Sequence, residues 1–220
     1  MSVSVRQSAA VATLARLEAA RAIAVLRARD SAEAVSVAEA LAEGGLQAIE
    51  LTFTTPGAAD ALAEARRLLP PHVLLGAGTI TTRAELEAAL DAGADFLVSP
   101  HLDPVLLKSM LASGRLALPG VLTPTEVAAA LRAGTRAVKL FPAGTAGVAY
   151  MRSLFGPFPG LRVVPTGGIS IAGAREWLDA GAAAVGLGGE LVPRALLDAG
   201  AWGEIARNAS ALAAGVGGVT

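Results

Sequence analysis

The segment "RAGTRAVKLFP" (132–142) joins a glycine turn to a short apolar strand, and three other segments repeat this pattern. The other three are "EGGLQAIELTF" (43–53), "DAGADFLVSP" (91–100) and "DAGAAAVGLGG" (179–189). Each follows an Ala- and Leu-rich stretch with helical periodicity, and glycine commonly ends such a helix in a left-handed conformation. The glycines that align are Gly45, Gly93, Gly134 and Gly181. The repeat therefore predicts a helix, a glycine turn and a strand, four times over.

Four further β-rich segments lie between these repeats and bring the expected number of strands to eight. They are "AIAVLR" (22–27), "VLLGAGT" (73–79), "LALPG" (116–120) and "RVVPTGG" (162–168). Eight strands that alternate with helices in units of about 20–25 residues match the scale of a (β/α)8 TIM barrel. An open, doubly wound sheet is the alternative, but it does not require eight strands, and the even spacing favours the closed barrel.

The chain shows no break between domains. No Pro-, Gly- or Ser-rich linker divides it, so we expect a single barrel domain over residues 1–220, with an N-terminal helix and a C-terminal helix. Two of the helices are expected to start directly after Ser31 and Thr82, and Glu85 completes a capping-box pattern with Thr82.

The composition argues against several classes of function. The net charge of −1 is unlike a nucleic-acid surface, which needs a clustered basic excess. No apolar run approaches the ~20 residues of a membrane span. The chain has no cysteine, which excludes disulfides, thiolate metal sites and a cysteine nucleophile and fits a reducing compartment. We therefore expect a cytoplasmic protein that binds neither nucleic acid nor membranes.

Lys139 is one of only two lysines, and it lies within an apolar run. It stands five residues after its repeat glycine, as does Glu50 on the second strand. Both strands are even-numbered, and alternate strands of such a barrel contribute to the same interior layer. The equivalent positions on the other even strands are Val98 and Gly186, which leave room. We expect Lys139 and Glu50 to face each other inside the barrel.

A buried lysine beside a carboxylate has a specific chemical use. Burial disfavours the charged amine, and a neutral amine attacks carbonyl groups to form a Schiff base. Proton transfers around that imine need a nearby acid/base, which Glu50 supplies. A purely structural ion pair and an outward-facing Lys139 are the alternatives. Strand alternation favours the inward position, because it groups Ala137, Lys139 and Phe141 on one face and Val138 with Leu140 on the other.

Glycine-rich turns follow the last two strands. They are "PTGGI" (165–169) and "GLGGE" (186–190), and the loops after strands 7 and 8 are the usual phosphate site of a TIM barrel. Glycine lets backbone N–H groups approach an anion. "GAGT" (76–79) ends the third strand without bulk, so Thr79 is placed to face the site.

At this point the sequence resembles a known family, the 2-keto-3-deoxy-6-phosphogluconate (KDPG) and 2-keto-4-hydroxyglutarate (KHG) aldolases. The resemblance covers nearly the whole chain. The motifs that match are "IELTFTTPGA", "GAGT", "FLVSPHLD", "LPGVLTPTE", "KLFPAG", "GPFP" and "PTGGI". The family is one of small Schiff-base aldolases on a (β/α)8 barrel, typically trimeric and without a metal. The resemblance therefore implies a class I aldolase that releases pyruvate from a keto acid.

The resemblance also implies a role for each matching residue. Lys139 would form the Schiff base with pyruvate or the keto-acid substrate, and Glu50 would be the general acid/base. Three residues, Thr79, Pro100 and Phe141, would hold the pyruvyl part. Thr166 would contact the aldehyde end of the substrate. The residues expected at the phosphate end are Gly167, Gly168, Gly188 and Gly189.

Two departures from the family pattern concern anion binding. Thr54 stands where many members have an arginine that binds the substrate carboxylate, and we expect Arg27, at the end of the first strand, to take over this contact with the help of Thr54. Gly189 stands where a serine that helps to bind phosphate is common, and Glu190 follows it. The second change weakens the case for a phosphorylated substrate, although the backbone donors remain.

Several questions stay open from the sequence. Glyceraldehyde 3-phosphate, glyceraldehyde and glyoxylate all remain as the aldehyde released. Two other functions remain as alternatives: a phosphate-binding barrel isomerase or synthase that uses Glu50 without an imine, and a barrel scaffold without catalysis. Metal-dependent aldol chemistry is disfavoured, because the only histidines, His72 and His101, do not have the spacing of metal ligands.

Overall fold

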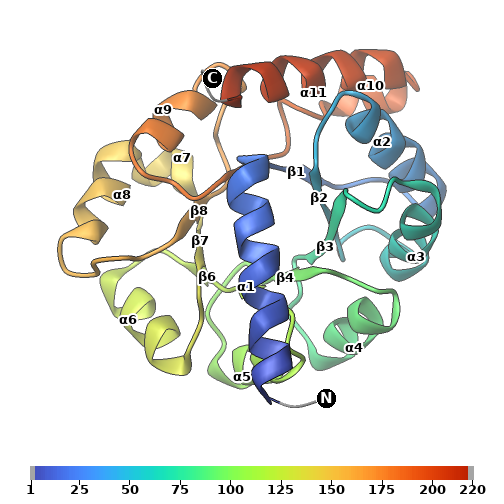
Figure 1. The fold of residues 1–220 in the computed structure, drawn as a ribbon. Coiled ribbons are helices and arrows are strands. Elements are labelled where there is room, and N and C mark those ends of the chain that lie inside the picture. Colours follow the sequence, from blue (N-terminus) through green and yellow to red (C-terminus); the bar gives the residue numbers. More distant parts are fainter. Residues whose placement is uncertain (1–2, 218–220) are drawn as a thin grey trace.

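The computed structural model describes residues 3–217, with side chains from residue 9 onward. Short parallel strands occupy the centre and helices surround them (Figure 1). The strands are β1 Ala22–Leu26, β2 Ala48–Thr52, β3 Leu74–Gly78, β4 Phe96–Val98, β5 Leu116–Leu118, β6 Gly120–Val121, β7 Val138–Leu140, β8 Val163–Pro165 and β9 Val185–Leu187. The helices are α1 Val3–Ala20, α2 Ser31–Glu43, α3 Ala58–Leu68, α4 Arg83–Asp91, α5 Pro104–Ala112, α6 Pro124–Ala133, α7 Ala143–Ala146, α8 Val148–Phe155, α9 Ala174–Asp179, α10 Arg194–Asp198 and α11 Trp202–Val216.

The strands form two parallel sheets. One sheet has six strands in the order β5-β4-β3-β2-β1-β9, and the other has three in the order β6-β7-β8. Between the sheets, only Pro119 separates β5 from β6, and a single parallel bridge joins Thr166 to Gly186. The predicted α/β architecture with a parallel sheet is confirmed, because helices alternate with the strands along the chain. The predicted helices near the two ends of the chain are α1 and α11.

The repeat glycines have the backbone that the sequence predicted. Gly45, Gly93, Gly134 and Gly181 have φ values of 91°, 86°, 96° and 102°. Glycine adopts this left-handed conformation at little cost, so each helix can turn sharply into the next strand. Only Gly134 is itself the helix cap; the other three follow the cap residue by one position.

One helix start was assigned wrongly from sequence. α2 begins at Ser31, but its capping residue is Asp30, whose carboxylate accepts a hydrogen bond from the Glu33 amide at 2.9 Å. Aspartate is at least as good an N-cap as serine, and here it stands one residue earlier. The capping box of Thr82 and Glu85 is confirmed.

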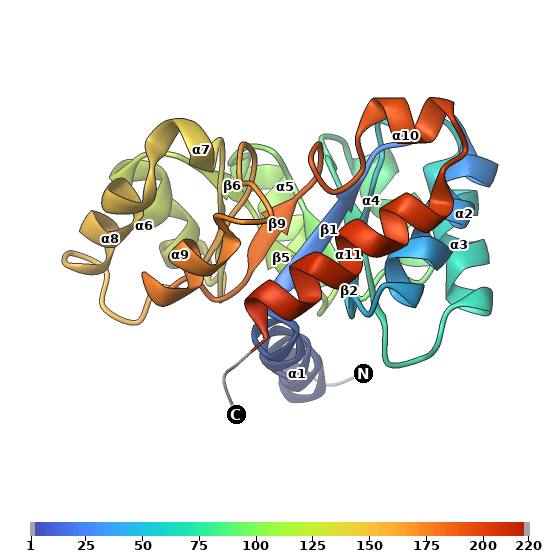
Figure 2. The same ribbon diagram turned by 90° about the horizontal axis from the view of Figure 1, so that it is seen from above.

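The interior of the strand arrangement is closed at one end by α1. Inward-facing side chains such as Ile23, Leu74 and Phe96 form one buried cluster with Leu17 of α1. Leu17 is fully buried, and burial of a leucine contributes about 1.5–3 kcal/mol. A second, larger cluster lies between the outward strand faces and the surrounding helices. Figure 2 shows α1 at one end of the strands and α7 and α10 at the opposite end.

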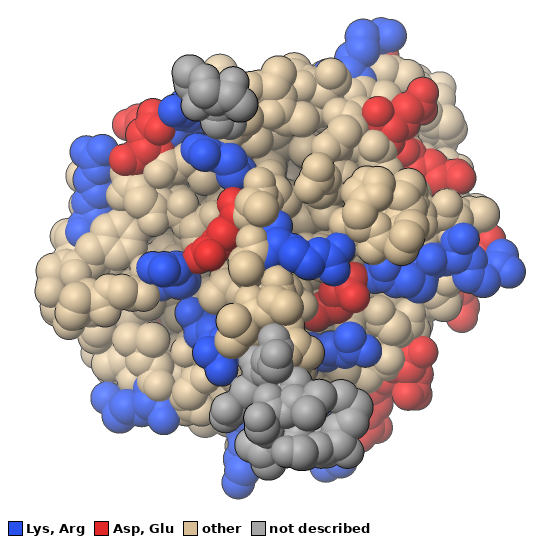
Figure 3. Space-filling view, in the orientation of Figure 1, with Lys and Arg blue, Asp and Glu red and all other residues tan. Residues whose placement is uncertain are grey.

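The surface that carries α1 displays charges of both signs (Figure 3), in line with the near balance of 18 Lys and Arg against 19 Asp and Glu in the chain. None of the helices within residues 3–217 has the length and apolar character needed to cross a membrane. Glu50 is the middle residue of β2 and Lys139 the middle residue of β7, and both are buried.

Candidate active site

Lys139 and Glu50 meet inside the strand arrangement, and the predicted facing of the two side chains is confirmed. Lys139 Nζ lies 4.0 Å from Glu50 Oε1, and the two side chains are 6% and 3% exposed. Their strands, β7 and β2, belong to different sheets, so the contact spans the centre of the fold. Val138 and Leu140 pack in the outer cluster, as strand alternation predicted. An amine and a carboxyl group are therefore held together away from bulk water.

Glu50 occupies space that glycine provides. A Cβ atom at Gly78 would lie 1.9 Å from Glu50 Oε1, so no larger residue fits beside the carboxyl group. Oε1 has no hydrogen-bond partner within the described part of the chain. Burial raises the pKa of the Glu50 carboxyl, and the charges of Lys139 and Arg27 oppose this shift without overcoming it. A carboxyl group with a raised pKa both accepts and donates protons near neutral pH.

Lys139 is flanked by two of the residues expected to hold a pyruvyl group. The ring centroid of Phe141 lies 5.1 Å from Nζ, within the range of a cation–π contact. Gly120 pairs with Lys139 across the β6–β7 ladder, and a Cβ at Gly120 would lie 2.3 Å from the Pro100 carbonyl. Pro100 therefore lies directly over the strand beside the lysine. Phe141 is 39% exposed, which places it at the mouth of the site.

Thr166 and the glycines after it form another wall. Thr166 is buried, and Gly186 makes room for it, because a Cβ there would lie 2.4 Å from Thr166 Oγ1. Gly167 has a φ of 89° and lies against the Phe141 ring, because a Cβ added at Gly167 would be 2.9 Å from a carbon of that ring. The amide of Gly144 donates to the Gly167 carbonyl at 2.7 Å and so ties the loop after β7 to the loop after β8.

Gly168 and Thr79 are placed by backbone that most residues avoid. Gly168 has a φ of 75°, and its Cβ would lie 3.2 Å from the Gly144 Cα. Thr79 is half-buried directly after Gly78, and its φ of 55° is left-handed, which is uncommon for a β-branched residue. Strained backbone of this kind persists where the surrounding structure enforces it, often at functional sites.

Arg27 and Thr54 form a hydrogen-bonded pair. Arg27 Nε donates to Thr54 Oγ1 at 2.9 Å, and Thr54 in turn lies 3.0 Å from the Thr52 hydroxyl. The Thr52 hydroxyl donates to the Leu26 carbonyl at 3.0 Å. This chain of hydrogen bonds joins the ends of β1 and β2 and orients the guanidinium.

A cavity of about 360 Å³ lies beside the Arg27–Thr54 pair. Its lining residues are Val25, Arg27, Ala28, Thr54, Gly188, Gly189, Val192, Arg194 and Leu197. The structure therefore brings Gly188 and Gly189 together with Arg27 and Thr54, while Lys139 and Glu50 do not line the cavity. The charge of Arg27 acts on Glu50 and links the two parts of the site electrostatically.

Three residues that shape this region were not among the site residues expected from the sequence. Gly78 and Gly186 give Glu50 and Thr166 their space, and Arg194 brings a second guanidinium to the cavity. The signal for Gly78 was present in the bulk-free "GAGT" segment, but the collision it avoids is visible only in three dimensions. Within the residues whose side chains are described, no group of three or more His, Cys, Asp or Glu could hold a metal ion.

The fold and site define an α/β enzyme that holds a buried amine and a buried carboxyl group between its parallel strands. The sequence pattern of the family described as "KDPG and KHG aldolase" matches residues 14–208. The chain belongs to this family and is an aldolase, a lyase.

Relatives with known names agree with this assignment. A 2-dehydro-3-deoxy-phosphogluconate aldolase of Pseudomonas aeruginosa is 37% identical over 205 residues, 92% of this chain and 91% of the relative. The enzyme of the same name from Treponema pallidum is 40% identical over 163 residues, 74% of this chain and 77% of the relative. A crystal structure of KDPG aldolase from Legionella pneumophila has a TM-score of 0.84 and 32% identity, covering 90% of this chain and 97% of that one. That structure holds pyruvate captured at low pH as a covalent carbinolamine intermediate.

Proposed function

We propose that the protein is a class I aldolase that reversibly cleaves a 2-keto-3-deoxy or 2-keto-4-hydroxy acid to pyruvate and an aldehyde. The substrates that fit are KDPG, which gives glyceraldehyde 3-phosphate, and KHG, which gives glyoxylate. The observation that supports this most directly is the buried 4.0 Å contact between Lys139 Nζ and Glu50 Oε1. Pyruvate bound covalently in the Legionella relative supports the same chemistry.

In this proposal the Lys139 amine attacks the C2 carbonyl of the keto acid and forms a carbinolamine, which loses water to give a protonated imine. Glu50 takes the proton of the C4 hydroxyl while the C3–C4 bond breaks. The bonding electron pair moves to the imine nitrogen, so the aldehyde leaves and an enamine remains. Glu50 then returns the proton to C3, and water hydrolyses the resulting imine to release pyruvate and the free amine.

Five side chains and two glycine-rich turns position the substrate in this mechanism. Arg27, held by Thr54, binds the carboxylate of the keto acid by charge-assisted hydrogen bonds. Pro100, Phe141 and Thr79 enclose the pyruvyl part. Thr166 contacts the aldehyde end, where its hydroxyl lies in the space left by Gly186. The turns that offer backbone donors to the far end of the substrate contain Gly167, Gly168, Gly188 and Gly189.

We also propose that the two sheets close into one eight-stranded barrel, in a single domain over residues 1–220. In this arrangement β5 and β6 act as one strand interrupted at Pro119. The amide of Lys139 donates to the Pro119 carbonyl at 2.9 Å, and the amide of Ser99 donates to the Leu118 carbonyl at 3.3 Å, so ladder-like bonds continue on both sides of the interruption. The bridge between Thr166 and Gly186 supports closure between β8 and β9.

The proposal extends to the oligomeric state, the cellular location and the cofactor requirement of the protein. We propose a homotrimer from the family resemblance, and a cytoplasmic location from the cysteine-free sequence and the metabolic relatives. No metal is assigned to the reaction, because the covalent imine on Lys139 supplies the electron sink that a Lewis acid would otherwise provide.

Trapping with borohydride tests the proposal. The protein is incubated with pyruvate, reduced, and analysed by intact mass and peptide mapping. We expect one stable adduct on Lys139 and none after Lys139→Arg, which also abolishes cleavage. Lys108→Arg is the matched control, because Lys108 is the other lysine of the chain and lies exposed on α5. An adduct that forms elsewhere, or none at all, would favour an isomerase, a synthase or a scaffold instead.

A further inference from the structure

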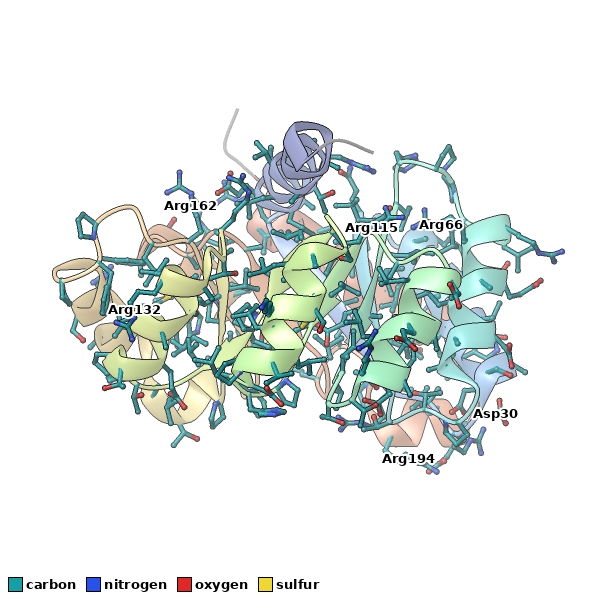
Figure 4. All side chains as sticks on the ribbon, turned by 90° about the horizontal axis from the view of Figure 1, so that it is seen from below. Asp30, Arg66, Arg115, Arg132, Arg162 and Arg194 are labelled. Carbon is teal, nitrogen blue, oxygen red and sulfur yellow. The ribbon has the colours of Figure 1, made fainter. Side chains whose placement is uncertain are left out.

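The cavity beside Arg27 carries positive charge on two sides. Arg27 approaches from the end of β1, and Arg194 approaches from the first residue of α10. Its lining residues include no aspartate or glutamate. Figure 4 shows Arg194 and Asp30 at the end of the molecule opposite α1, which is the end where the strands present the candidate active site. A cavity with two guanidinium groups is suited to an anionic ligand.

The size of the cavity exceeds what one carboxylate needs. A volume of about 360 Å³ falls within the range of small-ligand pockets. Gly189 lies on its wall, and a Cβ there would meet no atom within 4 Å, so the space beside this backbone is open. If Arg27 binds the keto-acid carboxylate, a second group of the substrate has room in the same cavity.

The Arg194 guanidinium has N–H donors left over to bind that second group. Its Nε donates to Asp198 Oδ1 at 3.0 Å, one helical turn along α10, and both side chains are more than half exposed. Arg29 also lies 3.8 Å from Asp198. Exposed pairs of this kind contribute little to stability. The guanidinium has five N–H donors, and the bond to Asp198 Oδ1 uses the one on Nε.

We propose that Arg194 binds the anionic group at the distal end of the substrate, a phosphate or a carboxylate, and so selects substrates that are charged at both ends. This inference rests on the proposed function. Arg194 would provide by charge what Gly189, which has no side-chain donor, cannot provide. Asp198 competes with the substrate for the same guanidinium, so it limits the affinity of the cavity for anions.

The test compares Arg194→Ala with the wild-type protein on three keto acids: KDPG, KHG and unphosphorylated 2-keto-3-deoxygluconate, which is neutral at its distal end. We expect kcat/KM to fall roughly tenfold for at least one of the doubly charged substrates. For the neutral substrate we expect less than a twofold change, since no distal charge is lost. A loss on KDPG alone identifies a phosphate site, a loss on KHG alone a carboxylate site, and a loss on both a general anion site.

Two further variants complete the test: one is expected to strengthen anion binding, and the other is a control that should have no effect. Asp198→Asn removes the competing carboxylate, so inorganic phosphate should inhibit this variant at lower concentration than the wild type and Arg194→Ala at higher concentration. Arg83→Ala removes another exposed arginine, which pairs with Glu87 in the same i,i+4 manner on α4 and is not among the residues that line the cavity. Its kinetics on all three substrates should match the wild type.

The inference is overturned if Arg194→Ala changes none of the three substrates, or changes the neutral substrate as much as the charged ones. Failure of the proposed function looks different. In that case the wild type itself would cleave none of the keto acids and would form no adduct with pyruvate on Lys139, whereas an intact adduct in Arg194→Ala shows that the covalent chemistry survives without this arginine.

Discussion

Gly78 and Glu50 lie so close together that a single added methyl group at residue 78 would sit 1.9 Å from the carboxylate. Residues 76 and 78 are both glycine on β3, which pairs with β2 along its length. The position of the carboxyl group, and so its distance to Lys139, depends on the absence of a side chain on the neighbouring strand.

Gly78→Ala is therefore expected to displace Glu50 and disable catalysis without unfolding the protein. Misplacement of a catalytic group by about 1 Å can lower the rate about 100-fold, and we expect a fall in kcat of that order. Gly203→Ala is the matched control, because a Cβ there meets nothing within 4 Å on helix α11. Steady-state kinetics with circular dichroism measures both. Normal turnover in Gly78→Ala would show that Glu50 has freedom to move aside.

Glu50→Gln separates the covalent step from the proton transfers. The amide keeps the shape of the carboxyl group but cannot accept a proton, so exchange of the pyruvate methyl protons with deuterium oxide should slow at least ~100-fold. The borohydride adduct on Lys139 should still form. Nuclear magnetic resonance follows the exchange, and mass spectrometry follows the adduct. Unchanged exchange would remove Glu50 from the role of acid/base.

The pH profile should report both Glu50 and Arg27. Because burial raises the pKa of Glu50, the acidic limb of kcat/KM should lie above the ordinary value of 4.5. Arg27 favours the ionised carboxylate, so Arg27→Ala removes that help and moves the limb to still higher pH. Arg27→Lys keeps the charge and should leave the limb in place while weakening the bidentate contact with substrate. A limb that stays fixed in Arg27→Ala would contradict this coupling.

The sequence predicted the Lys139–Glu50 contact because equivalent positions of a repeated unit take equivalent places in the fold. Each residue stands five positions after its repeat glycine, Gly134 or Gly45, which predicted the same depth along the barrel. Both belong to even-numbered strands of the expected eight, which predicted that they contribute to the same interior layer. The family resemblance added Arg27 and Thr54, and their hydrogen bond shows that the two residues are neighbours.

Other features could not be read from one chain. The interruption at Pro119 splits an expected strand, because proline lacks the amide that a ladder needs. Arg194 belongs to the cavity through the path of the chain between β9 and α10, and no local pattern marks that approach. The left-handed backbone of Thr79 depends on its tertiary surroundings, since threonine by itself disfavours that conformation.

Stability should depend on pH through the capping box of α6. Hydrogen bonds from Thr123 and Leu122 lower the pKa of Glu126, so its contribution is present above the pKa of an unfolded glutamate and is lost as pH falls through the folded value. Glu126→Gln should lower the free energy of unfolding by about 0.5 kcal/mol at pH 7, and by less at pH 3. Urea denaturation measures both. Glu87→Gln, an exposed glutamate paired with Arg83, is the control. If the loss of stability in Glu126→Gln were larger at pH 3 than at pH 7, the lowered pKa of Glu126 would not be a source of stability.

Thr79 is expected to trade stability for function. Its φ of 55° costs a non-glycine residue roughly 1–2 kcal/mol, whereas glycine adopts this conformation freely but loses more chain entropy on folding. Thr79→Gly should therefore raise the free energy of unfolding by about 0.5–1 kcal/mol while raising KM for the keto acid, because the hydroxyl is lost. Arg21→Gly is the control: Arg21 also has a positive φ, of 61°, but it lies directly before β1, at the amino end of that strand, so turnover should not change. If Thr79→Gly lowered stability, or left KM unchanged, the strain at this position would have no connection with substrate binding.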